Sequence, residues 1–191
     1  MPRLYRNDEM SEKRQGLIHV YTGEGKGKTT AAMGLALRAA GHGWRTYIGQ
    51  FMKGQDYGEL HAAPLLGTDD QGRPLLIIEQ YGNPSFIHVD EASEEDIRLA
   101  QEGLARAREA MCSGDYAIVV LDEINVALYF KLLTVQDVLS LIDQKLPEVE
   151  LVLTGRRVPD EILDRADYVT NMQEIRHPYQ RGILARKGIE N

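Results

Sequence analysis

The amino-acid sequence predicts an α/β fold, a three-layer sandwich in which helices cover both faces of a mainly parallel central sheet. Short apolar runs alternate along the chain with longer segments of helical pattern, which is the order of elements in parallel α/β sheets. The clearest run, residues 117–121, is apolar on both faces, and such strands lie in sheets that helices cover on both sides. Residues 17–21 then run directly into a glycine-rich turn and a helix-like segment, as a strand–turn–helix unit does.

In the first half of the chain, glycines separate the expected elements. Residues 17–21 predict a buried strand, and the glycine-rich segment 22–30 joins it to a helix that ends at the Gly-His-Gly sequence 41–43. Residues 45–51 predict a second strand. Residues 52–74 are rich in Gly, Asp and Pro and predict a long loop with room for one helical turn; loops of this length are often functional.

The second half of the chain continues the alternation. Ser93 opens a long helix, and Asp96, three residues later, forms an imperfect capping box with it. Thr134 begins another helix, and residues 159–165 predict a short one. The remaining apolar runs that predict strands are 75–78, late in the first half, and 117–121, 150–154 and 168–172 in the second.

Length and composition predict a cytoplasmic protein with one α/β domain over residues 15–191 and a flexible N-terminal arm over residues 1–14. The chain has 191 residues, of which 43% are hydrophobic and 27% charged, as in ordinary globular proteins. The net charge of −7 argues against nucleic-acid binding, which needs a basic face. No apolar run is long enough to cross a membrane, and the polar start of the chain is unlike a signal peptide. A single cysteine, Cys112, excludes an internal disulfide.

The glycine-rich segment after the first strand has the composition of a phosphate-binding loop. Glycines let successive backbone N–H groups point inward, and the N-terminus of the following helix adds a partial positive charge. Lys28 can reach terminal phosphates, and the Thr29 hydroxyl can bind a magnesium ion. The loop is one residue shorter than the usual phosphate-binding loop, because Gly23 precedes Gly27 by four positions. The alternative is a glycine-rich turn with no ligand, whereas a dinucleotide fingerprint does not fit.

A pair of acidic residues follows the most apolar strand. Asp122 and Glu123 come directly after residues 117–121, where a parallel sheet presents its carboxyl edge beside a phosphate-binding loop. A carboxylate at that edge can hold magnesium directly or through water. Acidic residues after a strand are as often solvated turn residues, but together with Lys28 and Thr29 they predict a metal–triphosphate site with Thr29, Asp122 and Glu123 as the metal residues.

The order and spacing of seven motifs resemble those of the ATP:cob(I)alamin (corrinoid) adenosyltransferases, a family with a RecA-like phosphate-binding-loop fold, over residues 16–190. The motifs are TGEGKGKTTAA (22–32), QFMKG (50–54), VLDEIN (120–125), LTGR (153–156), ADYVTNM (166–172), RHP (176–178) and ARKGIE (185–190). The resemblance implies transfer of the 5′-deoxyadenosyl group of ATP to the cobalt of a reduced corrinoid, with release of triphosphate, in adenosylcobalamin synthesis or salvage. It also implies a homodimer, Mg²⁺ or Mn²⁺, and a separate reductant protein for the cobalt.

The resemblance also implies roles for individual residues. Lys28, Glu123 and Arg156 are the expected catalytic residues, although Arg156 could equally be a surface residue of its loop. The expected nucleotide and corrinoid contacts are Thr22, Gly23, Glu24, Gly25, Lys26, Gly27, Lys28, Thr29, Thr30, His177 and Phe86. For His177 the alternative is a turn residue, and for Phe86 it is a core residue. Where some family members carry a Phe/Trp pair, this chain has Phe86 without a tryptophan.

Two other functions remain open from the sequence. A phosphate-binding loop also serves ATPases and small-molecule kinases, in which Glu123 would act as the base. The same loop could also serve a nucleotide sensor without catalysis. No N-K-x-D sequence is present, which argues against a GTPase.

Overall fold

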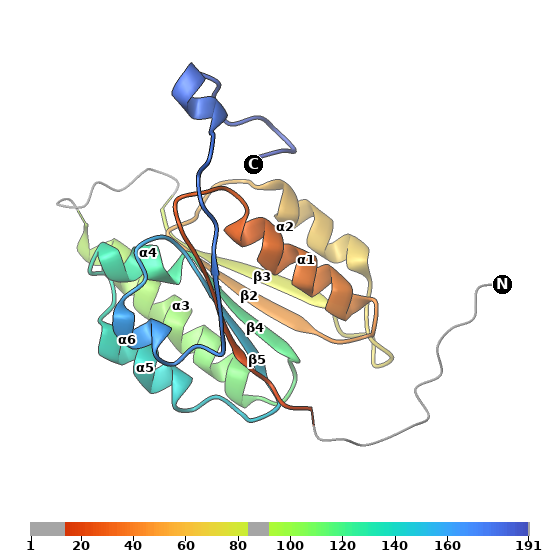
Figure 1. Ribbon diagram of the computed structural model, residues 1–191. Coiled ribbons are helices and arrows are strands. Elements are labelled where there is room, and N and C mark those ends of the chain that lie inside the picture. The colour runs from red at the N-terminus through yellow and green to blue at the C-terminus, as the bar shows by residue number, and fades with distance from the viewer. Residues whose placement is uncertain (1–13, 84–91, 191) are drawn as a thin grey trace.

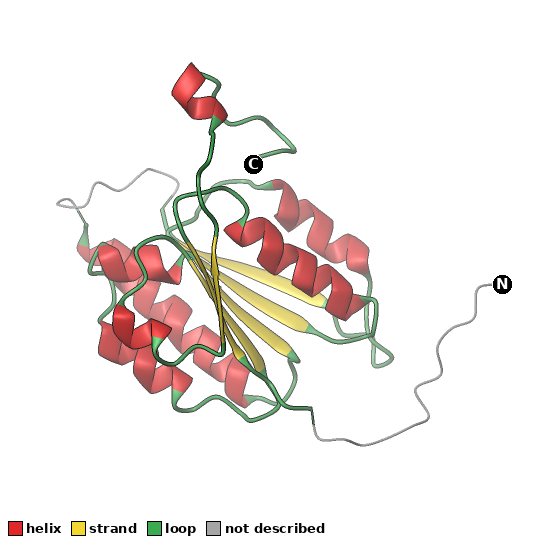
Figure 2. Ribbon diagram, in the orientation of Figure 1, coloured by secondary structure: helices red, strands yellow, loops and turns green. Residues whose placement is uncertain are grey.

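The computed structural model describes residues 14–83 and 92–190. The expected N-terminal arm, apart from Arg14, lies outside the described residues, and so does Phe86. Within the described ranges, three layers are visible, with helices on both sides of one twisted sheet (Figures 1 and 2). The predicted α/β fold is therefore confirmed.

All six strands of the sheet are parallel. Their order across the sheet is β3-β2-β4-β5-β1-β6. The strands are β1 (Ile18–Thr22), β2 (Thr46–Phe51), β3 (Leu76–Tyr81), β4 (Ile118–Asp122), β5 (Glu150–Thr154) and β6 (Tyr168–Asn171). Because β4 and β5 lie between β2 and β1, the chain crosses over them after the first strand. Because β1 pairs with β5 on one side and with β6 on the other, the phosphate-binding loop begins inside the sheet and not at its edge.

Helices flank the sheet on both faces. One face carries α1 (Lys28–Ala40), α2 (Gly58–Ala62) and the 3₁₀ turn η1 (Ala63–Leu66), and the other carries α3 (Glu94–Cys112), α4 (Ile124–Tyr129), α5 (Val135–Ile142) and α6 (Asp160–Leu163) (Figure 1). A second 3₁₀ turn, η2 (Pro178–Arg181), belongs to the C-terminal segment, which rises beyond the carboxyl edge of the sheet (Figure 1). No described helix has the length and apolar character needed to cross a membrane.

The two cores follow from the alternation of side chains along each strand. In β4, Val119 and Leu121 pack against α3 and its neighbours, whereas Ile118 and Val120 pack against α1. All five residues of β4 are buried. The strand is shifted by one residue from the predicted run 117–121, so that Asp122 is its last residue and does not follow it. The α1 face is built from small side chains, so that helix approaches the sheet closely; they are Ala32, Ala36 and Ala39.

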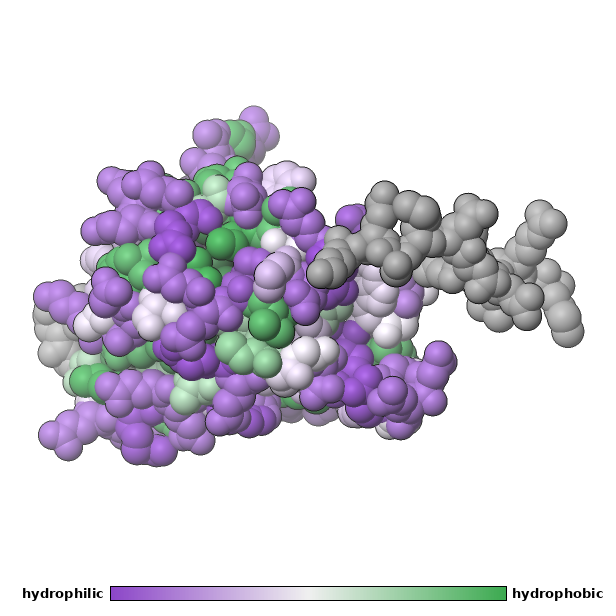
Figure 3. Space-filling model, turned by 90° about the horizontal axis from the view of Figure 1, so that it is seen from below, coloured by the Kyte–Doolittle hydropathy of each residue, from purple (hydrophilic) through white to green (hydrophobic). Residues whose placement is uncertain are grey.

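The outer surface has the opposite character. On the face seen in Figure 3, hydrophilic side chains surround small apolar patches. This arrangement agrees with the charged composition of the chain and its net charge of −7.

Several elements differ from the sequence-based prediction. The third strand continues to Tyr81, three residues beyond its apolar run, because it pairs with the whole length of β2. The predicted loop 52–74 holds α2 and η1, which is more helix than one turn. The helix α4 was not predicted, since it is six residues long and its N-cap residue, Glu123, makes no side-chain cap. The capping boxes of Ser93 and Thr134 are both complete.

Candidate nucleotide-binding site

The carboxyl edge of the parallel sheet gathers the predicted site residues. The loop after β1 leads into α1, and the ends of β2, β4 and β5 lie next to it. In open α/β sheets, ligands bind at this edge. A cavity of about 450 Å³ opens here, a size that suits a small-molecule ligand.

Lys28 closes the phosphate-binding loop from within. Its Nζ atom donates to the carbonyl oxygens of Gly23 at 2.7 Å and Gly25 at 2.8 Å, so the loop wraps around the lysine. Gly27 precedes the helix with a φ of 118°, a conformation that favours glycine. Burial lowers the pKa of Lys28, while the carboxylate of Glu123 opposes that change. A bound polyphosphate would supply the missing counter-charge.

The segment after β6 holds this loop in place. The N–H of Gly25 donates to the carbonyl of Met172 at 2.6 Å, and the N–H of Met172 donates to the carbonyl of Thr22 at 2.9 Å. A Cβ atom on Gly23 would lie 2.2 Å from the side-chain oxygen of Asn171, and one on Gly25 would lie 2.7 Å from the carbonyl of Met172. Two of the loop glycines are therefore required by close packing against the segment after β6.

Asp122 is the centre of a buried polar network. Its carboxylate is fully buried at the end of β4. Oδ1 accepts hydrogen bonds from the hydroxyls of Thr29 at 2.9 Å and Thr154 at 2.7 Å. Oδ2 accepts from Lys53 Nζ at 2.7 Å and from Gln50 Nε2 at 3.3 Å. With four donors on its two oxygens, the carboxylate has little capacity left for a further ligand.

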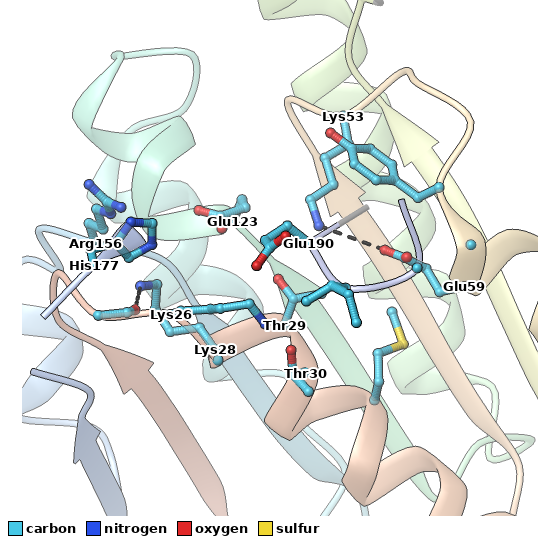
Figure 4. Close-up of a pocket in the computed structure, with 17 residues that line it drawn as sticks. Lys26, Lys28, Thr29, Thr30, Lys53, Glu59, Glu123, Arg156, His177 and Glu190 are labelled. Atoms are coloured by element: carbon cyan, nitrogen blue, oxygen red, sulfur yellow. Dashed lines mark hydrogen bonds and ion pairs between the residues drawn. The ribbon is translucent and has the colours of Figure 1, made fainter. Parts of the chain in front are cut away.

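Glu123 stands beside this network with its carboxylate directed to the cavity (Figure 4). Its backbone has a φ of 63°, and its N–H donates to the Thr154 hydroxyl at 2.9 Å. Burial raises the pKa of the Glu123 carboxyl, and the neighbouring charge of Asp122 raises it further. Among the described residues, no hydrogen bond or ion pair engages this carboxylate, so it is available for a cation.

Arg156 and His177 reach the cavity from two other segments. Arg156 follows β5 and pairs with the Glu24 carboxylate at 3.0 Å; both side chains are more than half exposed. His177 precedes η2, and its Nδ1 accepts from the N–H of Tyr179 at 3.2 Å, so it acts as a turn residue while also lining the cavity. Figure 4 shows the two side chains next to each other.

The structure thus brings together most of the residues that the sequence predicted. Those that line the cavity are Gly25, Lys26, Gly27, Lys28, Thr29, Thr30, Glu123, Arg156 and His177. Asp122 lies behind Thr29, and Thr22, Gly23 and Glu24 shape the loop without lining the cavity.

Sequence reasoning missed other residues of the cavity. They are Met33, Lys53, Tyr57, Gly58, Glu59, Gly188, Ile189 and Glu190. Lys53 and residues 188–190 belong to two of the motifs that carried the family resemblance. Nothing in the sequence of those motifs, however, indicated that these residues would line the cavity. Tyr57 and Glu59 lie in the segment that was predicted to be a functional loop.

The residues present fit a divalent cation bound together with phosphates. Three carboxylates line the cavity, those of Glu59, Glu123 and Glu190. Glu59 accepts a hydrogen bond from Gln50 and Glu190 pairs with Arg186, which leaves Glu123 as the one of the three that no described partner engages. The described residues contain no cluster of three or more His, Cys, Asp or Glu side chains that could hold a metal alone. The Glu123 carboxylate and the Thr29 hydroxyl are oxygen donors of the kind that can hold Mg²⁺ together with substrate phosphates and water.

Comparison with known proteins shows the family to which the chain belongs. The family model for the ATP:corrinoid adenosyltransferases BtuR/CobO/CobP matches residues 14–191. The chain belongs to this family. The resemblance that the seven motifs indicated is therefore confirmed, and with it the RecA-like phosphate-binding-loop character of the fold.

Individual relatives give the same result. A corrinoid adenosyltransferase of Sinorhizobium sp. is 32% identical over 185 residues, which cover 92% of this chain and 80% of that protein. The corrinoid adenosyltransferase of Escherichia coli K12 is 29% identical over 181 residues, covering 94% of this chain and 88% of that protein. An uncharacterized protein of Nostoc sp. PCC 7120 is 38% identical over 190 residues, and the chain spans about half of its length, 49%.

Proposed function

We propose that this protein transfers the 5′-deoxyadenosyl group of ATP to the cobalt of a reduced corrinoid and releases triphosphate. The observation that carries the proposal is the constellation of Lys28, Thr29 and Asp122 in a chain that belongs to the ATP:corrinoid adenosyltransferase family. A loop of this kind binds a polyphosphate, and the family supplies the reaction in which that polyphosphate is the leaving group.

The protein does not need to activate the attacking group, because the reduced cobalt is itself the nucleophile. The cobalt of the reduced substrate, in its +1 state, donates an electron pair to C5′ of the ribose. The C5′–O bond breaks, its electron pair leaves on the triphosphate, and the cobalt ends in the +3 state. The protein must therefore align cobalt, C5′ and leaving oxygen, and must stabilise the negative charge that develops on the phosphates.

The phosphate-binding loop performs the second of these tasks. On binding, the triphosphate takes the place of the Gly23 and Gly25 carbonyls as partner of the Lys28 ammonium. Arg156 exchanges its exposed contact with Glu24 for a phosphate, which it can hold with two parallel hydrogen bonds. Lys26 adds a further positive charge at the mouth of the cavity. Once the triphosphate is bound, these positive charges lie where negative charge develops as the C5′–O bond breaks.

A divalent cation, Mg²⁺ or Mn²⁺, would be held by the hydroxyl of Thr29 and the carboxylate of Glu123. When bound, it neutralises charge on the departing phosphates. Asp122 contributes through its hydrogen bond from Thr29. Glu123 on this view serves the cation, and it does not activate a water molecule or an acceptor hydroxyl.

The wider setting is part of the same proposal. We infer a cytoplasmic homodimer with residues 15–191 as one domain, supplied with reduced corrinoid by a separate reductant protein, in adenosylcobalamin synthesis or salvage. Support for the dimer comes from apolar side chains that are exposed on the edge strand β6 and the segment after it; they are Tyr168, Val169, Ile175 and Tyr179.

The test is a reaction under anaerobic conditions with ATP, Mg²⁺ and chemically reduced cobalamin. We expect the absorbance of a cobalt–carbon bond to appear and inorganic triphosphate to accumulate in equal amount. ADP with a phosphorylated product, or ADP with phosphate, would instead identify a kinase or an ATPase. ATP binding without any turnover would favour a nucleotide sensor.

A further inference from the structure

Lys53 is a partly buried lysine whose position is fixed by the backbone. After β2 ends at Phe51, Met52 adopts a φ of 57°, which turns the chain sharply. The following turn crosses the chain after β3 without space for side chains. A Cβ atom on Gly54 would lie 2.2 Å from the carbonyl oxygen of Gly82, and one on Gly82 would lie 2.5 Å from the Lys53 nitrogen. The turn thus returns Lys53 to the carboxyl edge of the sheet.

The Lys53 side chain lies between two carboxylates. It is 15% exposed, and its Nζ atom is 2.7 Å from Asp122 Oδ2 and 4.0 Å from Glu59 Oε1. The Tyr57 ring covers it, with the ring centre 5.2 Å from Nζ. Figure 4 shows Lys53 on the opposite side of the cavity from Arg156 and His177. The ammonium group is therefore engaged by the protein and stands apart from those two phosphate-binding candidates.

This contact determines what the Asp122 carboxylate can do. With Oδ2 held by the ammonium group, Asp122 is neutralised within the protein, and Oδ1 remains as the acceptor for the Thr29 hydroxyl. Since that hydroxyl donates its hydrogen to Asp122, its oxygen lone pairs are directed elsewhere. Residues behind a metal ligand commonly orient it in this way.

We propose that Lys53 is a positioning residue that acts through Asp122. It keeps this carboxylate as the acceptor for Thr29 instead of a direct metal ligand, and so presents the Thr29 oxygen to the cation bound with triphosphate. This role of Lys53 rests on the proposed function in one respect, which is that the ligand of the site is a divalent cation bound with triphosphate. The rival role is a direct contact between Lys53 and phosphate.

A double-mutant cycle separates the two roles. The four proteins are wild type, Lys53→Met, Asp122→Asn and the double variant, and the measurement is the affinity for Mn²⁺ in the presence of ATP, followed by the electron paramagnetic resonance of free Mn²⁺ without any corrinoid. Lys131→Met, at an exposed lysine after α4, is the matched control. Circular dichroism at the temperature of the titration establishes that each variant is folded.

We expect Lys53→Met alone to weaken Mn²⁺ binding by about tenfold or more. In the D122N background the same substitution should change the affinity by less than about twofold, because its route of action is already removed. An equal loss in both backgrounds would overturn the proposal and indicate a direct phosphate contact. If the Lys53→Met variant does not fold, the Mn²⁺ affinities of D122N and of the double variant are compared instead. A tenfold difference between these two affinities would overturn the proposal. If the wild-type protein binds Mn²⁺ and ATP but forms no cobalt–carbon bond, the proposed function is refuted, whereas the positioning role of Lys53 is not.

Discussion

Replacement of Asp122 by asparagine tests whether the buried network is as tightly coupled as the contacts indicate. The substitution keeps Oδ1, so the hydrogen bonds from Thr29 and Thr154 can persist. It places an amide NH₂ where Oδ2 accepts from Lys53 and Gln50, and those two donors then face a third donor. The ammonium group of Lys53, at 15% exposure, loses its only contact shorter than 4.0 Å with a described carboxylate.

The magnitude follows from these losses. Breaking a buried ion pair by removal of one charge costs about 3–5 kcal/mol, because the other charge stays buried without compensation. For a chain of this size, each kcal/mol lowers Tm by about 2–4 °C, so Asp122→Asn should lower Tm by about 6–20 °C. Urea denaturation at pH 7 measures the free energy of unfolding, and thermal denaturation gives Tm.

The double variant Lys53→Met, Asp122→Asn provides the control. It removes both charges, and it should therefore be more stable than the sum of the two single losses predicts, by about 1 kcal/mol or more. A loss below about 1 kcal/mol for Asp122→Asn, or strictly additive losses in the double variant, would refute the reasoning. Either result would mean that the ion pair contributes little and that the network is held together by other contacts.

Two further predictions concern Glu123 and the glycine loop. Because the folded state raises the pKa of Glu123, this group favours folding below its unfolded-state pKa of about 4.3 and opposes it as the pH rises through its folded pKa. Glu123→Gln should therefore increase the free energy of unfolding at pH 7 but not at pH 4, as measured by urea denaturation; an equal gain at both pH values would contradict this. Gly25→Ala places a Cβ atom 2.7 Å from the carbonyl oxygens of Met172 and Gln173, and it should weaken ATP binding about tenfold in a calorimetric titration, because overpacking costs about 1–3 kcal/mol. Gly34→Ala, in open space on α1, is the control and should instead stabilise the fold by about 0.5–1 kcal/mol; unchanged ATP affinity in Gly25→Ala would show that the loop tolerates the displacement.

The fold was predictable from sequence because its signals are local. The apolar run 117–121, most of which forms β4, indicates a strand covered on both faces, and the alternation of strands and helices indicates a parallel sheet. The spacing of Gly23, Gly27 and Lys28 likewise places a phosphate-binding loop without any tertiary information. Ser93 and Thr134 stand at the starts of their helices, as predicted, and the capping box of Ser93, predicted to be imperfect, is complete.

The rest of the site depends on contacts between distant segments. Lys53 and Asp122 are 69 positions apart, and only the strand order, which places β2 beside β4, brings them together. The contact of Gly25 with Met172 likewise depends on the pairing of β1 with β6. Periodicity and composition carry no information on such pairings. The helix α4 was missed for a different reason, since it starts from the left-handed conformation of Glu123, a non-glycine residue.

The most direct test of the central claim follows the ribose carbon itself. ATP labelled with ¹³C at C5′ is incubated anaerobically with the protein, Mg²⁺ and reduced cobalamin, and the label is observed by nuclear magnetic resonance. The account predicts that the labelled carbon becomes bonded to cobalt while the three phosphates leave as one intact chain. Label that remains bonded to oxygen in ADP or AMP, with the phosphate chain cleaved, would contradict it.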